Sequence, residues 1–156
     1  MLRLGRDRAM TYRIAIYTGL RVGEIASLTL ADVHLDAKPP HVKLHAKHDK
    51  ARRGARQPLP DDLALAIRQY LDLRLQEAQE DALRHGTPAP IALSPTDALI
   101  PQVPVVRVFD RDLKMAGIVK KDEWKRTVDL HSLRHTFGTL LALSGVSPRT
   151  AMELMR

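Results

Sequence analysis

The sequence contains no cysteine, and aromatic residues make up only 4% of its 156 positions. The absence of cysteine excludes disulfide bonds, thiolate metal ligands and cysteine nucleophiles, and it fits a reducing compartment such as the cytoplasm. The scarcity of aromatic rings leaves little material for stacking on unpaired bases, which single-strand-binding proteins use.

Long apolar runs are also missing. The first residues lack the continuous apolar segment of a secretory signal, and no later stretch approaches the roughly 18 apolar residues of a membrane helix. We therefore expect a soluble, cytoplasmic protein without a membrane partner.

Basic residues are in excess. The chain has 25 Lys and Arg against 18 Asp and Glu, a formal charge of +7. This excess favours a polyanionic partner such as nucleic acid over an anionic membrane surface, and the few aromatic rings favour duplex DNA. Hydrophobic residues make up 44% of the chain, enough for the core of one domain at this length.

The apolar pattern predicts a mainly α-helical protein with a small antiparallel β-hairpin or three-stranded sheet, an α+β fold. Alternation over residues 41–47 and a short extended segment from residue 55 predict the hairpin. Prolines interrupt residues 87–104 repeatedly, which predicts a loop packed over the domain. Helices are expected over residues 8–18, 22–28, 61–85, 105–116, 131–144 and from 148 onward.

Arg21 lies in the segment TGLRVGEIASL, between a Thr-Gly turn and the second expected helix. Glu24 follows three residues later, close enough on a helix to brace the guanidinium or to bond nearby backbone. An exposed Arg–Glu pair on the surface is the common structural explanation.

The segment HSLRHTFGTLLALSGVS places His131 and Arg134 three positions apart, on one face of a helix. His131 and His135 also have the spacing of paired zinc ligands, but Ser132 stands where zinc hydrolases have glutamate, and a third ligand is missing. For His135 we expect a buried or supporting role instead. The apolar residues expected to anchor this helix in the core are Leu133, Phe137, Leu140, Leu141 and Leu143.

These segments, together with the cationic hairpin KHDKARRGARQPLP between them, resemble the catalytic domain of the tyrosine recombinases, the phage integrase family. The resemblance covers nearly the whole chain, and the interval from Arg21 to His131, 131 − 21 = 110 positions, is that of the family. It implies site-specific DNA recombination or integration by strand cleavage and rejoining through a 3′-phosphotyrosyl intermediate, with no metal, nucleotide or other cofactor. It also implies duplex DNA as partner, a tetramer on two DNA sites, and a protein of the bacterial nucleoid or of a phage.

The resemblance assigns the reacting phosphate to Arg21, His131 and Arg134. Arginine forks can hold the non-bridging oxygens on which negative charge develops in the transition state. His131 would bond the phosphate and assist proton transfer, with a helix-capping role as its structural alternative.

The remaining roles implied by the resemblance fall on the hairpin and on supporting groups. Lys47 is the expected general acid for the leaving 5′ oxygen, Lys50 is the alternative, and Lys43 lies too early in the strand. Glu24 and His135 are expected to support the site. By composition alone the cationic loop could equally be a solvated loop. Contacts with the DNA backbone are expected from Lys50, Arg52, Arg53 and Arg56.

Members of this family continue to a second histidine or tryptophan and then to a nucleophilic tyrosine, whereas this sequence ends at AMELMR. Tyr12, Tyr17 and Tyr70 have the patterns of core residues. We therefore expect residues 1–156 to be a single catalytic domain without the N-terminal DNA-clamp domain or the tyrosine segment, through a laboratory truncation or a degenerate gene.

Such a chain is expected to bind DNA phosphate without cleaving it. A non-catalytic DNA-binding or interaction module derived from a recombinase is the alternative. A metal-dependent phosphodiesterase is a lesser one, because the carboxylate clusters for it are not evident.

Overall fold

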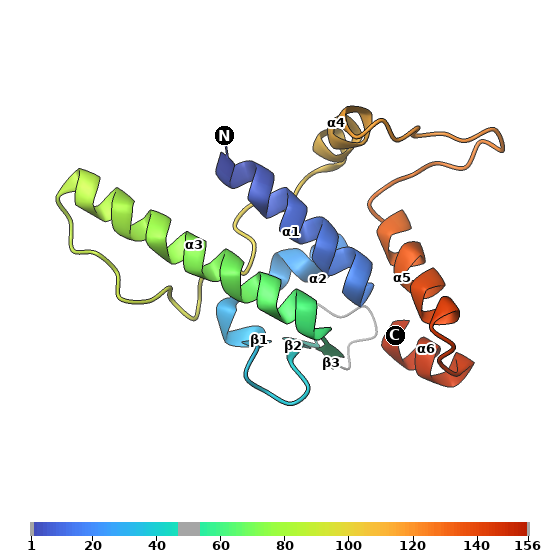
Figure 1. Cartoon of the computed structure of the whole chain (residues 1–156), viewed down its shortest axis with the longest axis horizontal. Helices are drawn as coiled ribbons and strands as arrows, with labels where there is room; N and C mark the ends of the chain where they lie inside the picture. Colours follow the sequence, from blue (N-terminus) through green and yellow to red (C-terminus); the bar gives the residue numbers. More distant parts are fainter. Residues whose placement is uncertain (1, 47–53, 156) are drawn as a thin grey trace.

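The computed structural model describes residues 2–46 and 54–155, and it confirms a mainly helical fold with one small sheet (Figure 1). None of the described helices is long and apolar enough to cross a membrane. The elements, in chain order, are α1 (Leu2–Thr18), α2 (Val22–Ser27), the 3-10 helix η1 (Leu30–Asp32), β1 (Val33–His34), β2 (His41–Leu44), β3 (Ala55–Pro58), α3 (Asp61–His85), α4 (Val106–Met115), α5 (Ser132–Leu143) and α6 (Pro148–Met155).

The sheet is antiparallel throughout, in the order β1-β2-β3. Val42 and Leu44 of β2 and Gln57 of β3 are buried, while Lys43 and Arg56 between them are exposed. Because successive side chains of a strand point to opposite faces, the sheet has one face on the core and one toward solvent. The alternation predicted from the sequence is therefore confirmed, and it determines which face of the sheet packs on the core.

The core lies between α1, α2, the inner face of the sheet and the first half of α3. It also takes in the predicted packed loop, which places Leu99 and Ile100 in the interior. Hydrogen bonds to the backbone of this loop hold it in place. The Leu99 N–H donates to the Leu28 carbonyl at 2.8 Å, and the Arg74 side chain donates to the carbonyls of Ala98 and Leu99. The loop is held in this way before it leads into residues 103–106.

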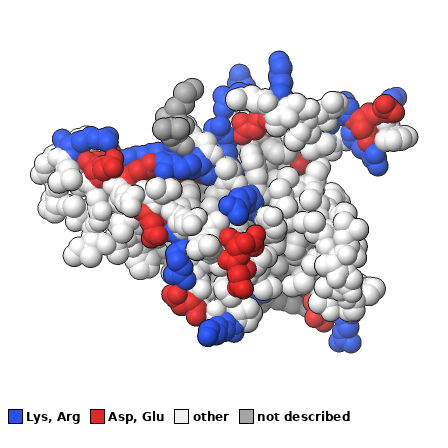
Figure 2. All heavy atoms as spheres, viewed as in Figure 1, with Lys and Arg blue, Asp and Glu red and all other residues white. Residues whose placement is uncertain are grey.

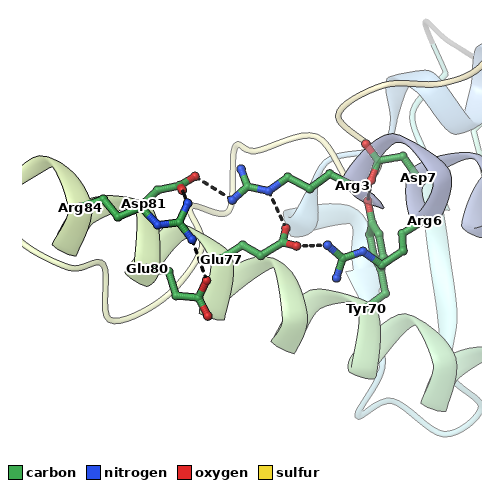
Figure 3. Close-up of polar contacts among 8 residues, drawn as sticks. All are labelled: Arg3, Arg6, Asp7, Tyr70, Glu77, Glu80, Asp81 and Arg84. Carbon is green, nitrogen blue, oxygen red and sulfur yellow. Dashed lines mark hydrogen bonds and ion pairs between the residues drawn. The ribbon is translucent and has the colours of Figure 1, made fainter. Parts of the chain in front are cut away.

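Polar contacts join the first two turns of α1 to α3 (Figure 3). Arg3 pairs with Glu77 at 3.0 Å and with Asp81 at 2.7 Å, and the buried Tyr70 hydroxyl donates to Asp7 at 2.7 Å. Exposed ion pairs contribute little, so the buried Tyr70–Asp7 bond is the stronger tie. Helix α1 begins at Leu2, six residues before the predicted start. The sequence there lacks a clear apolar repeat, so the prediction missed these residues. The contacts with α3 stabilise the helix in this part.

The predicted anchoring of α5 is confirmed in part. Of the five apolar residues named for it, Phe137 is buried and Leu133 is partly buried against the core, while Leu140 and Leu143 are 42% and 79% exposed. Helix α5 packs on α1 and α6, and its remaining surface faces outward. Figure 2 shows the surface over α5 as mostly uncharged on the face in view.

The start of α3 carries two acidic residues. Pro60 is the N-cap residue, and Asp61 and Asp62 lie in the first turn. Their charges there favour the positive end of the helix dipole. The predicted end is confirmed, because Gly86 closes the helix with a left-handed backbone, φ 65°.

Candidate functional site

Arg21 is the residue immediately before α2, and Glu24 holds it from two sides. The Arg21 N–H donates to Oε2 of Glu24 at 2.7 Å, and its Nη1 lies 2.9 Å from Oε1. The Glu24 side chain is only 3% exposed. The Arg21–Glu24 pair is therefore not the exposed surface pair that the sequence left open as an alternative. A buried carboxylate that bonds both backbone and guanidinium restricts the directions in which Arg21 can point.

Arg134 reaches the same turn from α5. Its side chain is buried, and Nη1 donates to the carbonyl oxygen of Gly19 at 2.5 Å across 115 positions of sequence. Gly19 has a left-handed backbone, φ 64°, which ends α1 and turns the chain into the segment that carries Arg21. The turn between α1 and α2 therefore sets the position of both arginines.

The two arginines and His131 line one pocket of about 610 Å³. Its walls are otherwise apolar, and no acidic residue of the described chain is among them. Two guanidinium groups against apolar walls favour an anion, because low polarity strengthens their electrostatic interaction with it. The pocket is lined by Leu20, Arg21, Val22, Ala26, Val103, Pro104, Val105, Val106, Leu130, His131 and Arg134.

His131 lies directly before α5 but does not cap it with its side chain. Asp129 and Ser132 do so reciprocally, since Ser132 N–H donates to Asp129 Oδ1 at 2.8 Å and Asp129 N–H donates to Ser132 Oγ at 3.0 Å. Burial would raise the pKa of Asp129, but the bonds from Ser132 outweigh it and lower that pKa. The imidazole of His131 makes no capping bond and lines the pocket, and its charge interaction with Asp129 also helps to lower the pKa of that carboxylate.

His135 is exposed, so of its two expected roles the buried one is wrong and the supporting one stays a prediction. Its ring packs edge to face against that of His131, with centroids 5.1 Å apart. This contact can limit the rotation of the His131 ring. In residues 2–46 and 54–155, no group of three or more His, Cys, Asp or Glu side chains is arranged to bind a metal ion.

The structure describes only some of the other basic residues that were predicted from the sequence to be functional. Lys47, Lys50, Arg52 and Arg53 lie outside the described residues. Arg56 is described, and it is exposed on β3 directly opposite Lys43 of β2. Of the four residues expected to contact the DNA backbone, the structure therefore describes only Arg56, and its contact stays a prediction.

A pair between the buried Asp32 and the exposed His45, near the end of β2, was missed from the sequence. The Nε2 atom of His45 lies 2.6 Å from Oδ1 of Asp32, which also accepts bonds from the Thr29 N–H and hydroxyl. Burial alone would raise the pKa of Asp32, but the bonds from Thr29 and His45 lower it. Thr29 and Asp32 have the spacing of a capping box, the one local signal that pointed to this carboxylate.

The three tyrosines of the sequence lie away from the pocket lining. Tyr12 donates to Asp112 at 2.8 Å and Tyr70 to Asp7, and burial together with these carboxylates raises the pKa of both phenols well above the ordinary value. Both are therefore poor sources of a nucleophilic phenolate. Tyr17 is 37% exposed, which corrects its assignment to the core.

Comparison with known proteins gives the family. The chain belongs to the phage integrase family, whose sequence model matches residues 4–156. It is 30% identical over 150 residues to the tyrosine recombinase XerC of Corynebacterium glutamicum, covering 96% of this chain and 42% of that protein. It is 27% identical over 141 residues to a tyrosine recombinase of Thermosipho africanus, covering 89% and 41%. The family resemblance read from the sequence is thus confirmed.

Solved structures show the same fold. The crystal structure of XerA recombinase matches with a TM-score of 0.61 at 23% identity, covering 98% of this chain and 51% of that one. The Tn1549 transposon integrase, solved in complex with transposon right end DNA, matches with a TM-score of 0.56 at 21% identity, covering 94% and 49%. This chain spans about half the length of these relatives or less.

Proposed function

We propose that this chain supplies the phosphate-binding part of a site-specific DNA recombinase. The pocket of Arg21, His131 and Arg134 would hold the phosphate of duplex DNA at which strands are cut and rejoined. One observation carries this proposal: residues from α2 and from α5, far apart in sequence, line one pocket with two arginines and a histidine. Membership of the phage integrase family and the DNA-bound Tn1549 integrase support it.

The geometry suits phosphoryl transfer, because the cations are fixed before the substrate arrives. Glu24 orients Arg21, and the Gly19 carbonyl orients Arg134. Negative charge that builds on the non-bridging oxygens would then meet donors that need not reorganise. Loss of one such donor typically costs about 3 kcal/mol of transition-state stabilisation.

In the reaction we propose, a tyrosine oxygen bonds to phosphorus and the bond to the 5′ oxygen breaks. The resulting 3′-phosphotyrosyl link is reversed by the 5′ hydroxyl of another strand. His131 would bond the phosphate and assist the proton transfers, and Lys47 would protonate the leaving 5′ oxygen. Tyr12 and Tyr70 are not proposed as the attacking group, because carboxylates hold their phenols outside the pocket.

Assembly and further DNA contacts belong to the same proposal. The recombinase would act as a tetramer on two duplex sites. Lys50, Arg52, Arg53 and Arg56 would contact backbone phosphates and provide affinity rather than sequence choice.

The pocket can be tested by binding of a fluorescently labelled DNA duplex, measured by anisotropy. Arg21→Gln should weaken binding roughly tenfold or more, because it removes charged hydrogen bonds. Arg21→Lys should give an intermediate loss, since lysine keeps the charge without the planar fork. Arg13→Gln, at an exposed position of α1, is the matched control. Equal losses for Arg21→Gln and Arg13→Gln, with circular dichroism showing both folded, would contradict the proposal.

A further inference from the structure

The solvent face of the sheet gathers basic side chains in register. Lys43 of β2 and Arg56 of β3 are exposed and directly opposite each other. In an antiparallel pair, like charges placed opposite each other destabilise the sheet. Within the described ranges, neither side chain has an acidic partner in an ion pair. Among the described residues the pairing is therefore unfavourable, and an external anion would relieve it.

Two histidines extend this face toward the β1–β2 turn. His34 and His41 are cross-strand partners, and their rings stack with centroids 4.8 Å apart. The Nδ1 atom of His41 lies 3.1 Å from the Pro39 carbonyl, so a proton on Nδ1 makes that bond and Nε2 is the nitrogen available to an outside ligand.

A hollow of about 270 Å³ lies beside these residues. It is lined by Lys38, Pro39, His41, Arg56 and Pro58, so each ionisable group that lines it is a base. Asp36, the acidic residue of the β1–β2 turn, pairs instead with Arg68 of α3 at 2.9 Å. The local charge is therefore left positive.

We propose that this outer sheet face, formed by His34, Lys38, His41, Lys43 and Arg56, is a second phosphate-binding surface that takes a backbone phosphate of duplex DNA. It is distinct from the Arg21 pocket, with which it shares no lining residue. The ligand is phosphate rather than metal, because ammonium and guanidinium groups repel cations and donate hydrogen bonds to phosphate oxygens. The inference rests on the proposed DNA function.

The test is the salt dependence of duplex binding by Lys43→Gln/Arg56→Gln. Each lost phosphate contact should reduce the log–log slope of affinity against salt by about one. The double variant removes both donors to the one proposed phosphate, so its slope should fall by about one. The control is Arg84→Gln/Arg149→Gln, which removes the same charge from side chains that are 67% and 91% exposed. Arg84 lies at the far end of the 25-residue α3, roughly 35 Å from the end that follows β3.

A drop in slope confined to the sheet variant, with its unfolding midpoint unchanged or raised, is the expected result. The midpoint should not fall, because the change removes a repulsive pair. Equal salt-dependence slopes for the sheet variant and the control variant would overturn the inference. Loss of binding to inorganic phosphate or to polyglutamate by the sheet variant would not rescue it.

Failure of this inference can be distinguished from failure of the proposed function. If Arg21→Gln weakens DNA binding while the sheet variant matches its control, only the outer sheet face is refuted. If the unaltered chain does not bind duplex DNA, both proposals fail.

Discussion

Replacing Gly19 with alanine tests how the fold holds the two arginines together. A Cβ at Gly19 would lie 2.4 Å from Cδ1 of Phe137, whose ring is buried, and the backbone there has φ 64°. The same residue accepts the hydrogen bond from Arg134. Relief of the clash requires the ring or α5 to move, and α5 carries Arg134.

The expected cost has two parts. A left-handed backbone with a side chain costs about 1–2 kcal/mol. Overpacking against a buried ring adds roughly 1–3 kcal/mol. The total of roughly 2–5 kcal/mol is a large share of the 5–15 kcal/mol that typically stabilises a domain.

Gly86→Ala is the matched control. Gly86 has nearly the same backbone, φ 65°, but nothing lies within 4 Å of the added Cβ. It should therefore lose only the backbone part, about 1–2 kcal/mol. The difference between the two variants isolates the contact with Phe137.

Urea unfolding followed by circular dichroism gives the free energy of unfolding of each variant. Duplex binding is then measured at a temperature where both are folded. Gly19→Ala should be the less stable variant and should bind DNA more weakly than Gly86→Ala. Equal destabilisation of the two, with unchanged DNA binding by Gly19→Ala, would refute the reasoning.

Three further substitutions test single interactions. Tyr70→Phe removes a donor from buried Asp7 and should lower the free energy of unfolding by about 1–3 kcal/mol in urea titrations, so an unchanged value would argue against the bond. Asp129→Ala removes the α5 cap and should cost about 0.5–2 kcal/mol, visible as a lower thermal midpoint. Asp32→Asn removes a carboxylate whose pKa is lowered in the folded state, so its contribution is full above the unfolded value of about 3.9 and is lost as pH falls through the folded value. The stability difference from the unaltered chain should therefore shrink between pH 7 and about pH 3, and a constant difference would contradict this assignment.

Local patterns predicted much of the fold because they report what neighbouring residues do. Alternation over β2 fixed which residues face the core, and Gly86 marked the end of α3. The motif around Arg21 and the His131–Arg134 pair identified residues that do line one pocket. Spacing alone left a surface role open for Arg21, and the family resemblance assigned these residues to one site.

The failures share a physical cause, which is contact between distant segments. Nothing local distinguishes Phe137, which packs on Gly19, from Leu143, which faces outward, because both are apolar residues of one helix. The pocket wall at residues 103–106 comes from a proline-rich loop whose path is set by backbone bonds to Leu28 and its neighbours. The bond between Asp32 and His45 joins η1 to the residue after β2, so only the folded chain shows it.

The most direct test of the central claim is a crystal structure of this chain with a short DNA duplex. The account predicts a backbone phosphate in the pocket, with its oxygens about 2.7–3.2 Å from guanidinium nitrogens of both Arg21 and Arg134. A duplex bound elsewhere on the chain, with no phosphate between these two arginines, would contradict it.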